Sequence, residues 1–113
     1  MTLVEKMPPN ILYHGTNHKA ITGILARGIV PKMDTFTHLT DSSKVAHDIA
    51  LKHGGRIVIC TINTKKMYED GYKFYLDENN VWNVEHVPTK YFKATFINTL
   101  KDLNDLPKEI VVK

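Results

Sequence analysis

The stretch Ile11-Leu12-Tyr13-His14-Gly15-Thr16 governs the interpretation of the whole chain. Its apolar start predicts a strand, and residues 17–27 predict a helix that ends at Gly28, with one apolar face formed by Ala20, Ile21, Ile24 and Leu25. A glycine at the junction lets a ligand approach the backbone closely, and the helix start offers N–H groups. A ligand site is one interpretation; a turn glycine beside an incidental histidine is the other.

The rest of the chain predicts a mixed α+β fold. A second helix is expected from the cap Asp41-Ser42-Ser43 to about His53, with an apolar face of Val45, Ala46, Ile49 and Ala50. The remaining expected elements are strands at 37–40, 56–62, 72–76, 81–84 and 91–97, with a helical turn at 65–70. The run 56–62 is the most apolar and predicts the central strand. This order favours α+β over a repeating βαβ arrangement.

The composition bounds the class of protein. The chain has 113 residues, of which 42% are hydrophobic and 24% charged, so disordered, collagenous and coiled-coil chains are excluded. We expect one domain over 1–113, with a leader at 1–10, a core at 11–98 and a loosely held, charged tail at 99–113. A net charge of +3 suits a phosphate-bearing ligand. Without a long apolar run or a signal sequence, the expectation is a soluble, cytoplasmic protein with no membrane partner.

Several single residues admit two interpretations. His38, between Thr37 and Thr40, could orient a sugar hydroxyl or be a core histidine. A metal site built from His14 and His38 is conceivable, but the other four histidines do not fall at recognised zinc-ligand spacings, so no metal is predicted. Cys60, within an apolar run, is expected to be a structural thiol.

Other positions are as ambiguous. The cluster Lys52, His53 and Arg56 could complement the dipole of the helix that ends there or bind phosphate. Glu78 and Glu85 could be catalytic carboxylates or solvated turn residues. Trp82 could stack on a ring or lie in the core.

The order of the motifs is more informative than any single residue. The chain reads LYHGT at 12–16, RGIVP at 27–31, THLT at 37–40, KHGGRIVICTI at 52–62 and MYEDGYKFYLDENNVWNVEHVP at 67–88. This series resembles the NAD-dependent RNA 2′-phosphotransferases, the bacterial KptA and eukaryotic tRNA 2′-phosphotransferase group, which carry HGT, HLS, RHG, DG-x-x-FY, S-E-N-G-V-W and V-P in the same order. The resemblance covers about residues 11 to 92.

The resemblance implies an ADP-ribosyltransferase-like fold, in which two small sheets and flanking helices form a cleft for NAD as co-substrate. The implied catalytic residues are His14, His38 and Lys52, and Lys52 and Arg56 would bind the substrate phosphate. His14 would contact the NAD sugars, and Gly15 would hold the nicotinamide amide through its backbone. The full implied NAD-binding set is His14, Gly15, Thr16, His38, Thr40, Asn79 and Val81.

The implied activity is transfer of ADP-ribose from NAD to a phosphate-bearing acceptor, with RNA expected, and release of nicotinamide, as in tRNA processing. In the family reaction an RNA 2′-phosphate attacks the nicotinamide ribose, and a neighbouring hydroxyl then frees the RNA and leaves ADP-ribose 1″,2″-cyclic phosphate. The alternatives are an NAD- or ADP-ribose-binding module without turnover, and an ADP-ribosyltransferase that modifies protein through Glu78.

Four departures from the family pattern bear on the acceptor. The N-terminal lobe that grips the RNA phosphate in full members is expected to be absent, so a partner chain could supply it. Lys52 replaces the arginine of RHG and loses the bidentate fork. Leu76 stands where arginine commonly follows FY, and Asn80 replaces the glycine of S-E-N-G. We therefore expect weak binding of the RNA phosphate.

Overall fold

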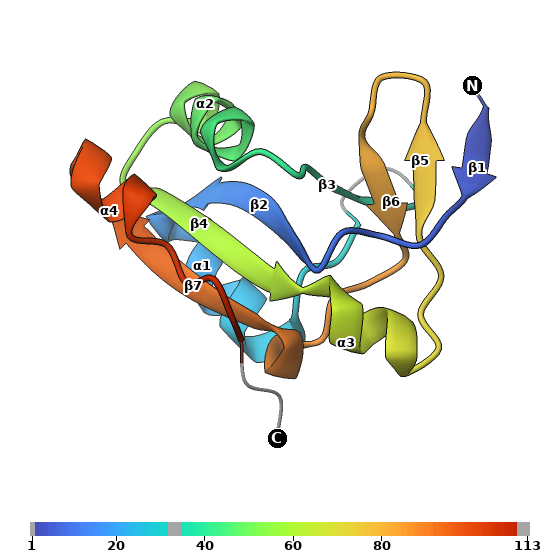
Figure 1. The fold of residues 1–113 in the computed structure, drawn as a ribbon. Coiled ribbons are helices and arrows are strands. Elements are labelled where there is room, and N and C mark those ends of the chain that lie inside the picture. The colour runs from blue at the N-terminus through green and yellow to red at the C-terminus, as the bar shows by residue number, and fades with distance from the viewer. Residues whose placement is uncertain (1, 32–34, 111–113) are drawn as a thin grey trace.

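The computed structural model describes residues 2–31 and 35–110, which form two small antiparallel sheets and four α-helices (Figure 1). The four-stranded sheet has the order β1-β5-β6-β3, with β1 at Leu3–Glu5, β5 at Tyr75–Asp77, β6 at Trp82–Val84 and β3 at Thr37–Leu39. The three-stranded sheet has the order β2-β4-β7, at Ile11–Asn17, Ile57–Asn63 and Phe92–Ile97. The predicted α+β class and the expectation of two small sheets are confirmed. No helix within the described residues has the length and apolar composition needed to cross a membrane.

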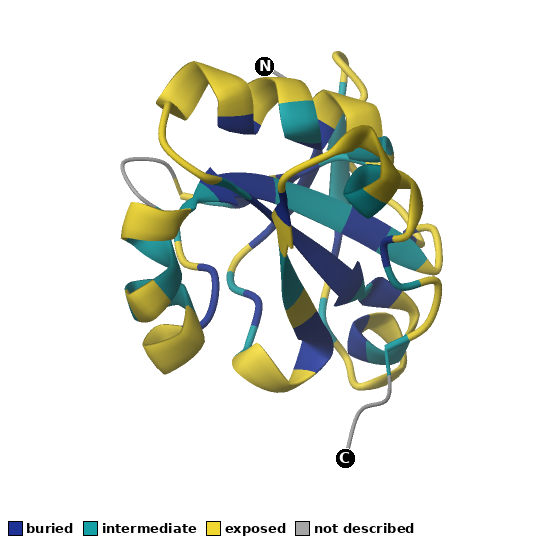
Figure 2. Ribbon diagram, turned by 90° about the vertical axis from the view of Figure 1, so that its left-hand side faces the viewer, coloured by how far each residue is buried: buried dark blue, intermediate teal, exposed yellow. Residues whose placement is uncertain are grey.

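Strand β4 is the centre of the larger core. Every residue from Val58 to Ile62 is buried, as the apolar run predicted (Figure 2). Alternate side chains leave opposite faces of a strand, so β4 serves two clusters. Cys60 and Ile62 join the cluster that includes Leu12, Phe74 and Tyr91, whereas Ile59 packs with Ala46, Ile97 and Leu106.

The two main helices begin and end where the caps predicted. Helix α1 spans His18–Arg27, and the Asn17 side chain accepts hydrogen bonds from the backbone N–H groups of Lys19 and Ala20. Helix α2 spans Ser43–His53, and the Ser42 hydroxyl accepts from the N–H of Val45. Each side chain satisfies N–H groups that a helix start would otherwise leave unpaired.

The predicted apolar faces of these helices are wrong in part. Leu25 of α1 is 58% exposed, and Val45 and Ile49 of α2 are 44% and 41% exposed. Ala46 and Ala50 are the α2 residues that are fully buried. Small residues on this face let the helix approach the sheet closely, and the branched side chains are left beside the site described below.

The predicted leader contributes an unexpected strand. β1 pairs with β5 from Leu3↔Asp77 to Glu5↔Tyr75. Its three residues alternate too briefly to be predicted from sequence. The strand predicted at 72–76 instead spans Tyr75–Asp77, and Phe74, which precedes it, is fully buried in the core. Helix α3 spans Thr64–Glu69, and a 3₁₀ turn spans Thr89–Tyr91.

The expectation of a loosely held tail is wrong for the described residues 99–110. Helix α4, at Leu100–Asn104, starts with a capping box in which the Thr99 hydroxyl accepts from the N–H of Asp102 and the Asp102 carboxylate accepts from the N–H of Thr99. Leu106 is only 7% exposed and packs with Ile59 and Ile97. Farther along, the Asn63 side chain donates to the carbonyl of Ile110 at 2.8 Å.

Removal of the Leu106 side chain tests the order of this segment. We expect Leu106→Ala to lower the free energy of unfolding by about 2 kcal/mol, because truncation of a buried leucine loses transfer free energy and leaves a cavity. Leu100→Ala is the matched control, since Leu100 lies in the same segment and is 75% exposed. Urea unfolding measures both. Equal free energies of unfolding for the two variants would show that this segment does not stabilise the three-stranded sheet.

Candidate functional site

The two sheets are joined by a backbone bridge between Tyr13 of β2 and Thr40, which follows β3, and beyond this bridge the two strands separate. The N–H of Tyr13 donates to the carbonyl of Thr40 at 2.8 Å, and the N–H of Thr40 donates to the carbonyl of Tyr13 at 3.0 Å. Backbone groups of alternate residues point to the same side of an antiparallel strand. The N–H and C=O of Gly15 therefore face away from β4, toward the side where β3 leaves for the other sheet.

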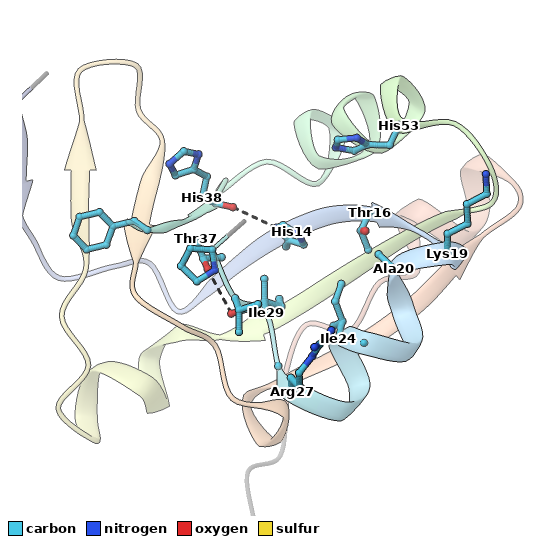
Figure 3. Close-up of a pocket in the computed structure, with 15 residues that line it drawn as sticks. His14, Thr16, Lys19, Ala20, Ile24, Arg27, Ile29, Thr37, His38 and His53 are labelled. Atoms are coloured by element: carbon cyan, nitrogen blue, oxygen red, sulfur yellow. Dashed lines mark hydrogen bonds between the residues drawn. The ribbon is translucent and has the colours of Figure 1, made fainter. Parts of the chain in front are cut away.

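Two histidines lie across this divergence. The Nδ1 atom of His14, on β2, is 3.3 Å from the carbonyl oxygen of His38, on β3 (Figure 3). A carbonyl oxygen can only accept, so this bond places the hydrogen on Nδ1. In the neutral ring, Nε2 is then the atom that accepts a hydrogen bond. The His38 side chain itself is exposed.

A cavity of about 380 Å³, the smaller cavity, opens beside this pair. Its lining includes every residue of the NAD-binding set that the sequence motifs imply: His14, Gly15, Thr16, His38, Thr40, Asn79 and Val81. These residues come from β2, from β3 and the position after it, and from the turn between β5 and β6. Val45 and Ile49 of α2 supply an apolar wall.

The larger cavity, of about 520 Å³, adjoins the first and is drawn in Figure 3. Both cavities share a set of four lining residues: His14, Thr16, His38 and His53. Helix α1 forms the opposite wall, with Lys19 and Arg27 near its two ends and the apolar Ile24 between them. Among the described residues that line either cavity, Asp41 is the one carboxylate. The paired cavity is therefore suited to an anionic ligand.

Two implied phosphate-binding residues lie outside both cavities. Lys52 is exposed near the end of α2, and His53 lines the cavities instead. Adjacent helical residues differ by about 100° around the axis, which turns Lys52 away from the face that His53 occupies. The guanidinium carbon of Arg56 lies 4.4 Å from the centre of the Phe96 ring. Their roles in binding phosphate remain predictions.

The structure explains the glycine at position 15 by close packing, which the sequence did not reveal. A Cβ atom at this position would lie 1.9 Å from the carbonyl oxygen of Ala46, so α2 packs directly against the bare backbone of β2. Gly15 is also buried. The expected need for close approach by a ligand is therefore not required to explain the glycine; close approach by a helix is sufficient.

Asp77 holds the turn that carries Asn79 and Val81. Its Oδ1 atom accepts from the N–H of Asn79 at 2.8 Å and from the N–H of Val81 at 3.0 Å. Partial desolvation raises the pKa of Asp77, but hydrogen bonds from Val81, Asn79 and Asn83, together with the nearby His38, outweigh it and lower the pKa. Glu78, in the same turn, is exposed and lines neither cavity.

The lowered pKa of Asp77 fixes the sign of a pH effect. A carboxyl group whose pKa is lower in the folded state stabilises the fold above its unfolded pKa of 3.8, and this contribution is lost as the pH falls through the folded value. We expect Asp77→Asn to be less stable than the wild type at neutral pH, with the difference shrinking below about pH 3.8. Thermal unfolding across pH measures it, with Glu78→Gln as control. A difference independent of pH would contradict the prediction.

The other candidates, Cys60, Trp82 and Glu85, line neither cavity. Cys60 is fully buried, and burial raises the pKa of its thiol to about 12, which makes the nucleophilic thiolate rare at neutral pH. Trp82 is 5% exposed and belongs to the larger core cluster. Glu85 is exposed and lines neither cavity. Within residues 2–31 and 35–110, no group of three His, Cys, Asp or Glu side chains could hold a metal ion.

Comparison with known proteins decides the family. A sequence model described as "RNA 2'-phosphotransferase, Tpt1 / KptA family" matches residues 1–86. The chain belongs to this family. The match covers both histidines and the turn after Asp77, so the residues that line the smaller cavity lie within the family region.

Individual members of the RNA 2′-phosphotransferase family agree. A probable RNA 2′-phosphotransferase of Fusobacterium nucleatum is 40% identical over 93 residues, which is 82% of this chain and 52% of that protein. Similar proteins from Acaryochloris marina and Burkholderia pseudomallei are 39% and 38% identical, and the aligned part is 50% of each. The chain thus spans about half the length of the curated relatives it matches.

The family motifs indicated the end of α2, through Lys52, but not the side of the helix that lines the smaller cavity. Val45, Ile49 and His53 are spaced four residues apart and therefore share one helical face, which lines the smaller cavity. In the sequence, the spacing of the two apolar residues predicts a core-facing stripe. A stripe that faces the core and a stripe that lines a cavity have the same spacing in the sequence. The partial exposure of Val45 and Ile49, which only the structure shows, distinguishes the second from the first.

Proposed function

We propose that this RNA 2′-phosphotransferase family chain is an NAD-dependent ADP-ribosyltransferase domain with an ADP-ribosyltransferase-like fold. Its reaction would transfer ADP-ribose from NAD to a phosphate-bearing RNA acceptor and release nicotinamide. One observation carries the proposal: all seven residues that the motifs implied for NAD binding, from separate segments of the chain, line one cavity. Packing of the hydrophobic core alone does not require these seven residues to line the same cavity.

The size and lining of the two cavities fit NAD. Volumes of about 380 and 520 Å³ lie within the usual range of ligand sites, and the two cavities adjoin, as the two nucleoside halves of NAD require. The backbone of Gly15 would pair with the nicotinamide carboxamide, which needs both a donor and an acceptor. Phe36, Ile24 and Ile29 give the larger cavity the apolar surface that an adenine would cover.

The chemistry assigned to the chain is chiefly positioning. When bound, NAD supplies the glycosidic bond that the acceptor phosphate breaks. His14, oriented by the carbonyl of His38, would accept a hydrogen bond from a ribose hydroxyl through Nε2. Val45, Ile49 and Val81 would keep water from the ribose carbon, which favours transfer over hydrolysis. Cations at the rim, Lys19 and Arg27, would offset the charge of the phosphates.

Mass spectrometry of one reaction tests the proposal. The protein is incubated with NAD and an RNA oligonucleotide that bears an internal 2′-phosphate. We expect free nicotinamide with either ADP-ribosylated RNA or dephosphorylated RNA and ADP-ribose cyclic phosphate. Nicotinamide with unchanged RNA would point to another acceptor or to hydrolysis. Intact NAD that nevertheless binds saturably would favour the binding module, and no binding of NAD would overturn the proposal.

The hypothesis of an ADP-ribosyltransferase that modifies protein, and that of a partner chain, need further reactions. For the first, a protein acceptor replaces the RNA. If NAD is consumed and a protein substrate gains ADP-ribose, Glu78→Gln distinguishes a catalytic carboxylate from a turn residue. Because Glu78 lines neither cavity, we expect this variant to retain full activity. Addition of a partner chain would be needed only if NAD binds and RNA bearing the 2′-phosphate remains unchanged.

A further inference from the structure

Three segments are locked together at one end of the molecule, where α1 and β4 begin and α2 ends. The N–H of His18 donates to the carbonyl of Arg56 at 3.0 Å, and the N–H of Arg56 donates back to Nδ1 of His18 at 3.1 Å. The Asn17 side chain donates to the carbonyl of Gly54 at 3.1 Å. These bonds fix the backbone positions from which the side chains at this end extend.

Basic side chains gather at this end in a way that the net charge does not reveal, beside the carboxylate of Asp102, which accepts from the N–H of Asn98. The sequence contains no Asp or Glu from residue 6 to 33, from 49 to 68, or from 86 to 101. These three segments supply α1, β4 and β7. Their exposed basic residues here define the basic edge: His18, Lys19, Lys52, His53 and Arg56. A surface of this kind attracts a chain of phosphates.

An aromatic ring lies within the basic edge. Phe96, near the end of β7, is 39% exposed although its neighbour Ile97 is buried. The Arg56 guanidinium carbon lies 4.4 Å from the centre of the Phe96 ring. A guanidinium group and an aromatic ring are both planes on which a nucleobase stacks, and cations beside them hold the backbone. An acidic peptide would use the cations and leave the ring without a role.

The basic edge is continuous with the candidate site. Lys19 and His53 belong to it and also line the larger cavity. We propose that the basic edge is the docking surface for a single-stranded RNA acceptor, in which Phe96 stacks a base and Arg56 both flanks that base and contacts a backbone phosphate. Lys19, Lys52 and His53 would hold the rest of the backbone. This proposal rests on the proposed function for its choice of RNA, and it places the acceptor at the end of the cleft where α2 ends.

Fluorescence anisotropy tests the basic edge directly. The probe is a fluorescein-labelled single-stranded RNA of about ten nucleotides, without a 2′-phosphate, in about 50 mM salt. We expect Phe96→Ala to weaken binding about fivefold or more, since it removes one base stack. We expect Arg56→Gln to weaken it and to reduce the slope of log K against log salt by about one. Lys65→Gln, on α3 at the other end of β4, is the matched control.

A second probe separates stacking from charge. Inorganic polyphosphate has phosphates but no bases, so Phe96→Ala should bind it as tightly as the wild type does, whereas Arg56→Gln should bind it more weakly. RNA binding that is absent in the wild type, or that is equal in the wild type, Phe96→Ala and Arg56→Gln, would overturn the docking surface. NAD binding, measured separately by calorimetry, should be unchanged in Phe96→Ala. Failure of NAD to bind the wild type would instead overturn the proposed function.

Discussion

His14→Ala is expected to reduce the release of nicotinamide from NAD by about a hundredfold or more, because small losses of positioning have effects of this size. The ring is held by β2 on one side and by the His38 carbonyl, 3.3 Å from Nδ1, on the other. It also lines both cavities, so one side chain borders both halves of the proposed ligand. The effect should fall on kcat as well as on KM, because the residue orients the ligand and does not merely bind it.

His47→Ala is the control for this experiment. His47 lies on α2 and lines neither cavity, so its loss should leave turnover within about twofold of the wild type. Circular dichroism and thermal unfolding establish that both variants are folded. Turnover in His14→Ala equal to that of His47→Ala would remove His14 from the site. A loss confined to KM would reduce its role to binding.

The helix bounds and the central strand could be predicted because their signals are local. Asn17 and Ser42 cap the two main helices with their own side chains, and the run from Val58 to Ile62 is apolar with the single exception of Thr61. Each of these features depends on neighbours in the chain. The order of the motifs also led us to expect that the seven residues implied for NAD binding lie together, and they do line one cavity.

The parts that could not be predicted depend on contacts between distant segments. β1 is a strand only because β5, far along the chain, is available to pair with it. The described part of the tail, residues 99–110, is ordered because Leu106 reaches Ile59 and Ile97, which lie on separate, paired strands of the sheet. Likewise Val45 and Ile49 look like core residues in the sequence, and only the packing of Ala46 and Ala50 shows which face is buried.

Lys52 illustrates a limit of motif transfer. A match to a family motif fixes the position of a residue in the chain, whereas the direction of its side chain depends on the phase of the helix that carries it. In this structure His53 reaches the cavities and Lys52 does not line them. If the basic edge binds RNA, Lys52 acts on the backbone outside the cavities, and the change from arginine to lysine matters less there because a point charge is sufficient for a solvated phosphate.

Gly15→Ala is expected to cause a large loss of stability for the addition of a single methyl group, about 3 kcal/mol or more. The added Cβ would lie 1.9 Å from the Ala46 carbonyl oxygen, and this neighbour is backbone within a helix, so it cannot rotate away. Relief requires α2 to move off β2. Since Val45, Ile49 and His53 of α2 line the smaller cavity, the same movement would deform the site.

Gly23→Ala is the matched substitution with the opposite expected sign. Gly23 lies inside α1, where a Cβ would meet only the end of the flexible Arg27 side chain at 2.9 Å. Alanine in a helix interior is favoured over glycine by roughly 0.5–1 kcal/mol, so this variant should be as stable as the wild type or more so. Urea unfolding measures the pair. If Gly15→Ala unfolds at the same urea concentration as Gly23→Ala, close packing of α2 on β2 does not explain the glycine, and the approach of a ligand to its backbone becomes the better explanation.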